Sequence, residues 1–326
     1  MSRDQTTADP LDLLVVGDCN PDVLVLGDDV TPEFGQHEKL VRSISLVVGG
    51  SAAITAVAAA RLGLRVALAA AIGADPAGEF MLGQLTSAGV GTSGIRVSSL
   101  ATGVTVALAH ADDRAILTAT GAMTALTADD VRRDLLAAAR HVHVSSYFLL
   151  EQSLGPGLAG LMATARANGS TTSLDTNWDP ADRWGGAQLR AVLPHIDILL
   201  PNKEEALRLS GEAALDAAVA TLTSAGRAVV VKLGASGAMC ADGGKVDCIS
   251  PPLGLDGAFV DATGAGDCFN AGLIAGLLRG LDLPAAARLG SAVGSASTRA
   301  AGGTAAAPDL PTALRLAAIP ESAPAR

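Results

Sequence analysis

The sequence predicts an α/β fold whose mostly parallel central sheet is covered by helices on both faces. Short apolar runs of strand length alternate with Ala- and Leu-rich segments of helical length along most of the chain. Strands of a parallel sheet are buried on both faces, so they read as nearly continuous hydrophobic runs. Six such runs are "LDLLVVG" (11–17), "RVALAAAIG" (65–73), "HVHVSS" (141–146), "TTSLD" (171–175), "DILLP" (197–201) and "AVVVKLG" (228–234).

The segments between these runs predict the helices and the limits of the domain. The clearest helical segments are 51–62, 155–168 and 202–224. Residues 22–48 and 95–120 carry β-type runs without intervening helices, as a small antiparallel sheet or flap would. The tails, 1–10 and 318–326, are polar or rich in Pro and Ala, so we expect them to be flexible. One domain is therefore predicted over 11–317.

Composition argues against several classes of partner. The net charge of −10 and the pI of about 4.9 disfavour nucleic acid and anionic membranes, which reward clustered Lys and Arg. Four cysteines without CxxC spacing predict reduced thiols in a cytoplasmic protein. The first ten residues lack the order of a signal peptide. Because Arg61 and Arg65 interrupt the Ala-rich stretch 52–72, we expect no membrane segment.

The stretch "VDATGAGDCFNAG" (260–272) predicts an anion site with an acid beside it. An apolar helical run follows the turn Gly264-Ala265-Gly266, which places Asp267 in the first helical turn. Backbone N–H groups at that end have no partner within the helix, and glycines let an anion approach them closely. Asp267 either caps its helix, as Asp often does, or serves as a base for a hydroxyl that attacks a phosphoryl group.

The common nucleotide-binding motifs do not account for this stretch. None of the four lysines precedes Ser or Thr, which excludes a P-loop. A dinucleotide fingerprint would need Gly at position 269, where this chain has Phe269. Phosphoryl transfer to a hydroxyl remains as the chemistry that one acid and an anion-binding turn can perform.

An ordered set of motifs gives the chain a family resemblance. "DATGAGD" (261–267) resembles the C-terminal signature of the ribokinase-like, PfkB-type carbohydrate kinases. The other matching strings are "GDCNPD" (17–22), "GGSAAITAVAAARLG" (49–63), "GADPAG" (73–78), "TGVTVAL" (102–108), "LDTNWDP" (174–180), "LLPNKEE" (199–205), "VVVKLGASG" (229–237) and "AGGTAAAP" (301–308). The resemblance covers roughly residues 11–316 and implies a ribokinase-like three-layer αβα sandwich. In that fold the segments 22–48 and 95–120 form a small β-sheet lid.

The resemblance implies ATP-dependent transfer of the γ-phosphate to a substrate hydroxyl. Asp267 would be the general base, and Gly264, Ala265 and Gly266 would form the anion hole. Asn202 and Glu205 would organise Mg²⁺, in part through water, although both also suit an ordinary helix start.

Three further positions would contact the nucleotide, and two others would hold a monovalent cation. By resemblance, Lys232, Gly234 and Gly237 line the nucleotide. Asp261 and Thr263 would bind a cation such as K⁺, or would merely cap their own turn.

On the acceptor side, the family pairs polar residues after the first strand with substrate hydroxyls. Here these are Asn20 and Asp22, although "CNPD" is also a good turn sequence. Gly49 and Gly50 would let the substrate lie against bare backbone, and Asn177 in "LDTNWDP" would complete the substrate site.

Two departures from the family pattern bear on substrate identity. Ile54 replaces an Asn that binds substrate in many sugar kinases, so it either faces a less polar edge of the ligand or packs its helix against the sheet. Asp179 replaces an Arg, which argues against a phosphorylated substrate unless Arg183 stands in.

We therefore expect a cytoplasmic ATP-dependent kinase of a sugar or sugar-like alcohol. The alternatives are a nucleoside kinase of the same superfamily and a catalytically silent homologue that binds a metabolite. Exposed strand edges in the lid would also allow two copies to pair as a homodimer. His141 and His143 alternate along a strand, and we expect them to pack or to bond locally.

Overall fold

The structure is a computed structural model that describes residues 10–110 and 113–321. The tails predicted at 1–10 and 318–326 therefore lie largely outside the described residues. No helix in the described part of the chain is long and apolar enough to cross a membrane.

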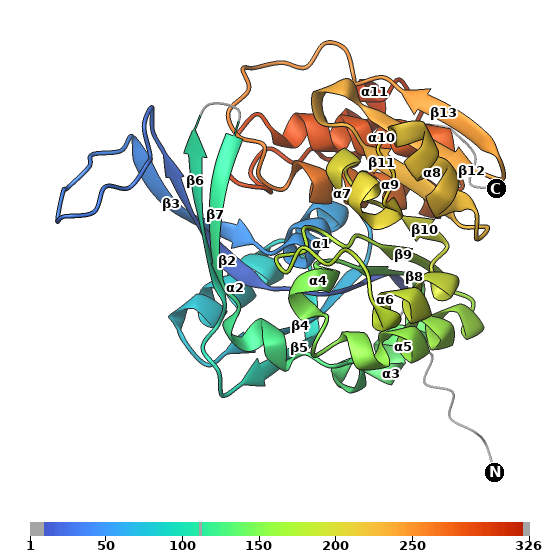
Figure 1. Cartoon of the computed structure of the whole chain (residues 1–326), viewed down its shortest axis with the longest axis horizontal. Coiled ribbons are helices and arrows are strands. Elements are labelled where there is room, and N and C mark those ends of the chain that lie inside the picture. Colours follow the sequence, from blue (N-terminus) through green and yellow to red (C-terminus); the bar gives the residue numbers. More distant parts are fainter. Residues whose placement is uncertain (1–9, 111–112, 322–326) are drawn as a thin grey trace.

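A nine-stranded sheet forms the centre of the molecule, in the order β13-β12-β11-β10-β9-β8-β1-β4-β5 (Figure 1). Seven strands run parallel, and the hairpin β12–β13 adds two antiparallel strands at one edge. The parallel strands are β1 (Leu11–Val16), β4 (Val66–Gly73), β5 (Gly91–Ser98), β8 (Ala139–Val144), β9 (Thr171–Leu174), β10 (Ile198–Leu199) and β11 (Ala228–Lys232). The hairpin consists of β12 (Ala238–Asp242) and β13 (Lys245–Ile249). The predicted α/β class and its mostly parallel sheet are confirmed.

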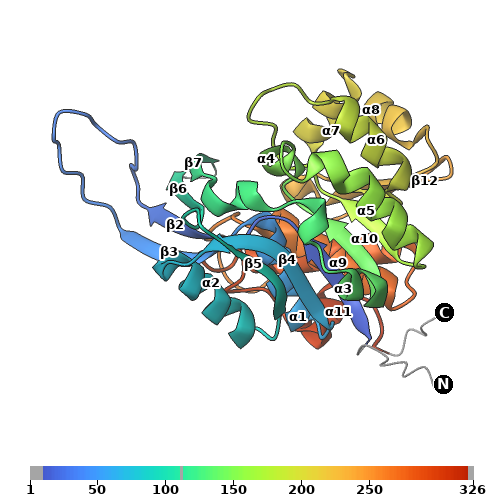
Figure 2. The ribbon, with the colours of Figure 1, turned by 90° about the horizontal axis from the view of Figure 1, so that it is seen from below.

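Helices cover both faces of this sheet, which gives three layers (Figures 1 and 2). Side chains alternate between the faces of a strand, so Leu13 and Val15 of β1 belong to one core, whereas Leu14 and Val16 belong to the other. The first core is covered by α1 (Ser51–Arg61), α2 (Pro76–Ser87), α9 (Ala265–Leu278), α10 (Leu283–Ser297) and α11 (Leu310–Leu316). The second is covered by α3 (Arg133–Ala138), α4 (Tyr147–Leu150), α5 (Gly155–Ala167), α6 (Ala187–Val192), α7 (Lys203–Ser210) and α8 (Leu215–Thr223).

A separate four-stranded sheet projects from one side of this body and continues into the long loop between β2 and β3 (Figures 1 and 2). Its order is β3-β2-β6-β7, with β2 (Asn20–Leu26), β3 (Ser43–Gly49), β6 (Val104–His110) and β7 (Asp113–Ala119). The expected purely antiparallel sheet is wrong in one pair, because β2 and β6 run parallel. β2 follows β1, and β6 follows β5; since β1 and β5 run in the same direction in the central sheet, both strands enter the small sheet in the same direction.

Two predicted boundaries also differ from the structure. Residues 95–98, assigned to the flap, belong to β5, which pairs with β4 in the central sheet. The helical segment 202–224 divides into α7 and α8, because Gly211 ends α7 with a left-handed backbone (φ 74°).

Candidate active site

Most of the predicted polar site residues lie near the carboxyl ends of the parallel strands. Such an edge is where open α/β sheets bind ligands. Asp18 follows β1, Asp175 follows β9, and Lys232 ends β11, so residues distant in sequence meet at one edge.

The glycine turn before α9 leaves backbone donors exposed beside Asp267. Gly264 is the N-cap residue with φ 71°, and a Cβ there would lie 2.5 Å from the Gly303 Cα, so both the turn and its neighbour require glycine. Within the described residues, the amides of Gly266 and Asp267 have no hydrogen-bond acceptor, whereas the Cys268 amide donates to the Gly264 carbonyl. Two amides and the positive end of the helix dipole are thus available to an anion.

Asp267 does not cap its helix, because the N-cap is Gly264 and no side chain makes a capping hydrogen bond there. The residue is only 7% exposed. Burial raises its pKa well above the usual value, and the charge of Asp175 raises it further, whereas Lys232 and a hydrogen bond from Ser51 act in the opposite direction. A buried carboxylate with a raised pKa is well suited to accept a proton.

Lys232, Asp175 and Asn270 form a buried cluster next to this acid. The Lys232 ammonium pairs with the Asp175 carboxylate, and the Asn270 amide donates to the same carboxylate at 2.6 Å. Burial lowers the pKa of Lys232, but the charges of Asp175 and Glu205 outweigh it, so the net shift is upward. Lys232 is therefore held in its charged form among the acids of this site.

Asp175 and Asn270 were not among the predicted site residues. Asp175 lies within "LDTNWDP", in which Asn177 was the predicted substrate-binding residue. Asn270 lies one helical turn after Asp267 and is fully buried in an otherwise apolar helix. A polar residue at that spacing was a usable signal, because a buried amide requires partners.

Asn202 and Glu205 start α7 with a reciprocal capping box. The Glu205 amide donates to Asn202 Oδ1 at 2.9 Å, and the Asn202 amide donates to Glu205 Oε2 at 2.8 Å. Burial and the charge of Asp175 raise the pKa of Glu205 to about 7, against the effect of Lys232.

Asn202 and Glu205 are better suited to hold Mg²⁺ through water and phosphate than to bind it as direct protein ligands alone. No group of three or more His, Cys, Asp or Glu side chains arranged to hold a metal occurs in the described ranges. Glu205 uses only Oε2 in the capping box, and Mg²⁺ commonly keeps several waters.

The N-terminus of α1 is fixed by Asp18, which the sequence analysis missed. Its carboxylate accepts hydrogen bonds from the amides of Ser51 (3.1 Å) and Ala52 (2.9 Å). Burial nonetheless raises the pKa of Asp18. Gly50, with φ 78°, makes the turn before the helix. Asn177 joins this turn to the end of β8, since it accepts from the Ser146 amide (2.7 Å) and donates to Ser51 Oγ (2.9 Å).

Asn20 and Asp22 lie together where β2 enters the small sheet. The Asn20 amide donates to Asp22 Oδ1 (3.0 Å) and to Thr105 Oγ1 (3.2 Å). A Cβ at Gly49 would overlap the Asp22 carboxylate, so only glycine leaves room for it. Both polar side chains are buried.

Ile54 lies in the first core, only 2% exposed. Cβ atoms built on Gly264 and Gly303 would lie about 3.0 Å from its Cγ2 atom. Ile54 therefore packs directly beneath the glycine turn, which favours the packing interpretation that the sequence analysis left open.

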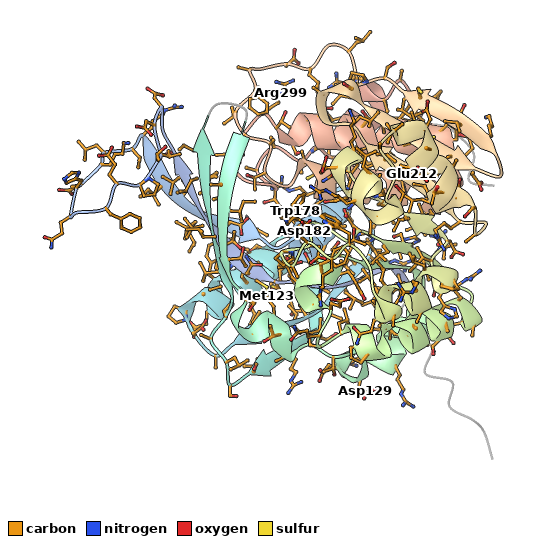
Figure 3. All side chains as sticks on the ribbon, viewed as in Figure 1. Met123, Asp129, Trp178, Asp182, Glu212 and Arg299 are labelled. Carbon is orange, nitrogen blue, oxygen red and sulfur yellow. The ribbon has the colours of Figure 1, made fainter. Side chains whose placement is uncertain are left out.

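The charged side chains Asp179 and Arg183 in the loop after β9 already have partners within the protein. Asp179 accepts hydrogen bonds from the amides of Ala181 (2.9 Å), Arg183 (2.7 Å) and Trp184 (2.8 Å). The Arg183 guanidinium pairs with Glu151. Figure 3 shows Trp178 and Asp182 in this loop, close to α4, and Trp178 is half exposed.

The remaining predicted positions lie at turns. Gly234 (φ 58°) and Gly237 (φ 90°) flank the turn after β11, and a Cβ at Gly237 would overlap the Ile249 carbonyl oxygen. Asp261 accepts hydrogen bonds from the amide and hydroxyl of Thr263 (2.9 and 2.8 Å) and from the Gly302 amide (2.8 Å). The two bonds from Thr263 favour the turn-capping interpretation of Asp261, and the third joins this turn to Gly302.

Known proteins resemble this chain over most of its length. The sequence family described as "pfkB family carbohydrate kinase" matches residues 11–310. A ribokinase of Haemophilus influenzae is 31% identical over 299 residues, which cover 87% of this chain and 91% of that protein. A nucleoside kinase of Methanothermobacter thermautotrophicus is 31% identical over 87% of this chain and 88% of its own length.

Solved structures share the fold. An E. coli protein described as a ribokinase II, in complex with ATP and Mg²⁺, superposes with a TM-score of 0.80 at 24% identity, covering 94% of this chain and 98% of that one.

Proposed function

The chain belongs to the pfkB family of carbohydrate kinases, and from this premise we propose that it transfers the γ-phosphate of ATP to a hydroxyl of a small sugar or sugar-like alcohol. The proposal rests mainly on the surroundings of Asp267. Its buried carboxyl group lies beside two free amides at the start of α9 and makes no capping bond. An acid that capped its helix would accept a hydrogen bond from an amide of the first turn.

In this mechanism, Asp267 takes the proton from the attacking hydroxyl. The amides of Gly266 and Asp267, with the glycines around Ala265, stabilise the charge that develops on the phosphoryl oxygens. Bound Mg²⁺ would neutralise phosphate charge, and Asn202 and Glu205 are the residues that would hold it through water. Lys232 balances the acids at the same edge, and its Nζ lies 3.6 Å from a Cβ built on Gly266. Gly234 and Gly237 would border the nucleotide.

The acceptor would bind where the chain passes from β1 of the central sheet to β2 of the small sheet. Asn20, Asp22 and Asn177 offer hydrogen bonds to hydroxyl groups, and the absence of side chains at Gly49 and Gly50 makes room for the Asp22 carboxylate and the Asn20 amide oxygen. The four-stranded sheet would close over it as a lid and exclude water.

We propose that this acceptor carries no phosphate or carboxylate. Asp179 is occupied by three backbone amides, and Arg183 is already paired with Glu151. This chain has Asp179 at the position where the family pattern has arginine. The nearby Arg183 guanidinium is already paired and is therefore not free to bind an anionic substrate.

A nucleoside is the second candidate acceptor. The half-exposed indole of Trp178 next to Asn177, together with the similarity to a nucleoside kinase, favours it. Aromatic faces stack on bases. Turnover of ribose and other sugars against adenosine and other nucleosides distinguishes the two candidates.

Two copies would pair through their lids. Exposed apolar side chains alternate along β3 at Ile44 and Leu46, and Ile116 and Leu117 are exposed on β7. Both strands are edges of the small sheet. Light scattering of the wild type and of Leu46→Lys tests this pairing, and a wild-type monomer would contradict it.

Asp267→Asn tests the mechanism. We expect the variant to bind a nonhydrolysable ATP analogue normally but to lose about two or more orders of magnitude in kcat. Asp282→Asn is a matched control, because Asp282 caps α10 through the Ala285 amide and should matter only for stability. Near-normal turnover of Asp267→Asn would refute its role as the base.

A further inference from the structure

Ser51, the first residue of α1, places a hydroxyl group beside the candidate base. This hydroxyl hydrogen-bonds the Asp267 carboxyl group. It is not needed to cap α1, because the N-cap is Gly50 and the amides of Ser51 and Ala52 donate to the Asp18 carboxylate. The Ser51 side chain is therefore available to act on Asp267.

Asn177 fixes the direction in which this hydroxyl points. The Ser146 amide can only donate, so the Asn177 atom that accepts from it at 2.7 Å is the side-chain oxygen. The nitrogen of the same Asn177 amide then faces Ser51 and donates to its Oγ at 2.9 Å. A serine hydroxyl has a single hydrogen. Because Oγ already accepts from Asn177, that hydrogen is left for the Asp267 carboxylate.

Thr55 attaches the same face of α1 to the main chain of Asp267. It lies one helical turn after Ser51, it is fully buried, and its hydroxyl donates to the Asp267 carbonyl at 3.3 Å. α1 therefore contacts Asp267 at its carbonyl through Thr55 and at its carboxyl group through Ser51. Since the Asp267 side chain makes no capping bond within α9, a contact from α1 can set its orientation.

We propose that Ser51 is a positioning residue that orients Asp267 for proton transfer from the acceptor hydroxyl. One carboxylate oxygen accepts from Ser51, and the other receives the proton as the acceptor oxygen bonds to the γ-phosphorus and ADP leaves. The proposal rests on the function proposed above, because it takes Asp267 as the base.

The charges around Asp267 determine the sign of the effect. Burial raises the pKa of Asp267, and the charges of Asp175, after β9, and Asp18, after β1, raise it further. Lys232, at the end of β11, lowers it. The Ser51 hydroxyl also lowers the pKa, because a donated hydrogen bond favours the ionised carboxylate. Without this hydroxyl the pKa of Asp267 rises, so the base form is lost at a higher pH.

The kinetics of Ser51→Ala over a range of pH test the proposal. We expect kcat to fall about tenfold at pH 7. The acid limb of kcat/KM for the acceptor should move up by about one pH unit, since a hydrogen bond to a charged group is worth roughly one pKa unit. Glu205 of α7 acts on the same Lys232, and burial raises the pKa of Glu205 to about 7. Because Glu205 is present in both proteins, the measured quantity is the shift between their profiles.

Two control variants separate positioning from a structural role. Ser51→Thr keeps the hydroxyl and should restore the wild-type acid limb. Ser224→Ala removes an exposed hydroxyl that donates to the Thr221 carbonyl of α8, and it should change neither kcat nor the acid limb. A lower melting temperature of Ser51→Ala with an unmoved acid limb would overturn the proposal. A higher KM alone would also overturn it, because Ser51 would then contact the substrate.

Asp267→Asn, measured in parallel, distinguishes failure of this proposal from failure of the proposed function. In the Asp267→Asn background, Ser51→Ala should cause no further loss of kcat, because Ser51 acts through Asp267. Near-normal turnover of Asp267→Asn would reject the base itself. If Asp267→Asn is inactive while Ser51→Ala matches the wild type at every pH, only the role of Ser51 is rejected.

Discussion

The buried carboxyl group of Glu205 makes a prediction about stability that is independent of catalysis. Glu205 is 4% exposed, and its pKa rises from 4.5 to about 7 because burial and the charge of Asp175 disfavour the ionised form. Replacement by Gln keeps an oxygen that can accept the Asn202 amide, so the capping box persists. Glu205→Gln therefore removes the charge and retains the local structure.

The sign and size of the effect follow from these two pKa values. Below pH 4.5 the group is protonated in the folded and unfolded chain, and it costs nothing. As the pH rises from 4.5 to 7, the unfolded chain ionises first, so the free energy of unfolding falls. Since one pKa unit corresponds to about 1.4 kcal/mol, the loss from pH 4.5 to pH 8.5 is about 3 kcal/mol. The variant should not suffer this loss.

Urea denaturation at pH 5.0 and pH 8.5 measures the difference. Glu205→Gln should gain stability relative to the wild type by about 2 kcal/mol more at pH 8.5 than at pH 5.0. Glu79→Gln, which replaces an exposed acid in the first turn of α2, is the control for the loss of one carboxylate. A stability difference for Glu205→Gln that does not vary with pH would refute the reasoning.

Two further substitutions test the acceptor side. Gly49→Ala should raise the KM for the sugar at least tenfold, because its Cβ must displace the Asp22 carboxylate, whereas Gly83→Ala, with open space around its Cβ, should not; equal KM values would contradict this role of Gly49. Ile54→Asn should lower the melting temperature and reduce kcat/KM for all substrates, because a buried amide without partners costs about 1–3 kcal/mol. A selective gain for a fully hydroxylated sugar would instead indicate that residue 54 contacts the substrate.

The sequence by itself determined the fold class, because buried parallel strands require continuous apolar runs wherever they occur. All six predicted runs contain or overlap strands of the central sheet. The glycine turn before α9 was also readable, since positive φ and free amides at a helix start are local properties. His141 and His143 were expected to pack or to bond locally, and both bond to Ser173 at 2.7 Å inside the sheet.

Tertiary structure alone decided which of these groups meet. Asp175 and Lys232 are 57 residues apart, and their pairing depends on β10 being short and lying between β9 and β11. Ile54 contacts Gly264 and Gly303 only because α1 packs against the start of α9. The pKa values of Asp267 and Glu205 depend on the same long-range arrangement. Burial and charge at a site are sums over neighbours in space, and a sequence lists neighbours only along the chain.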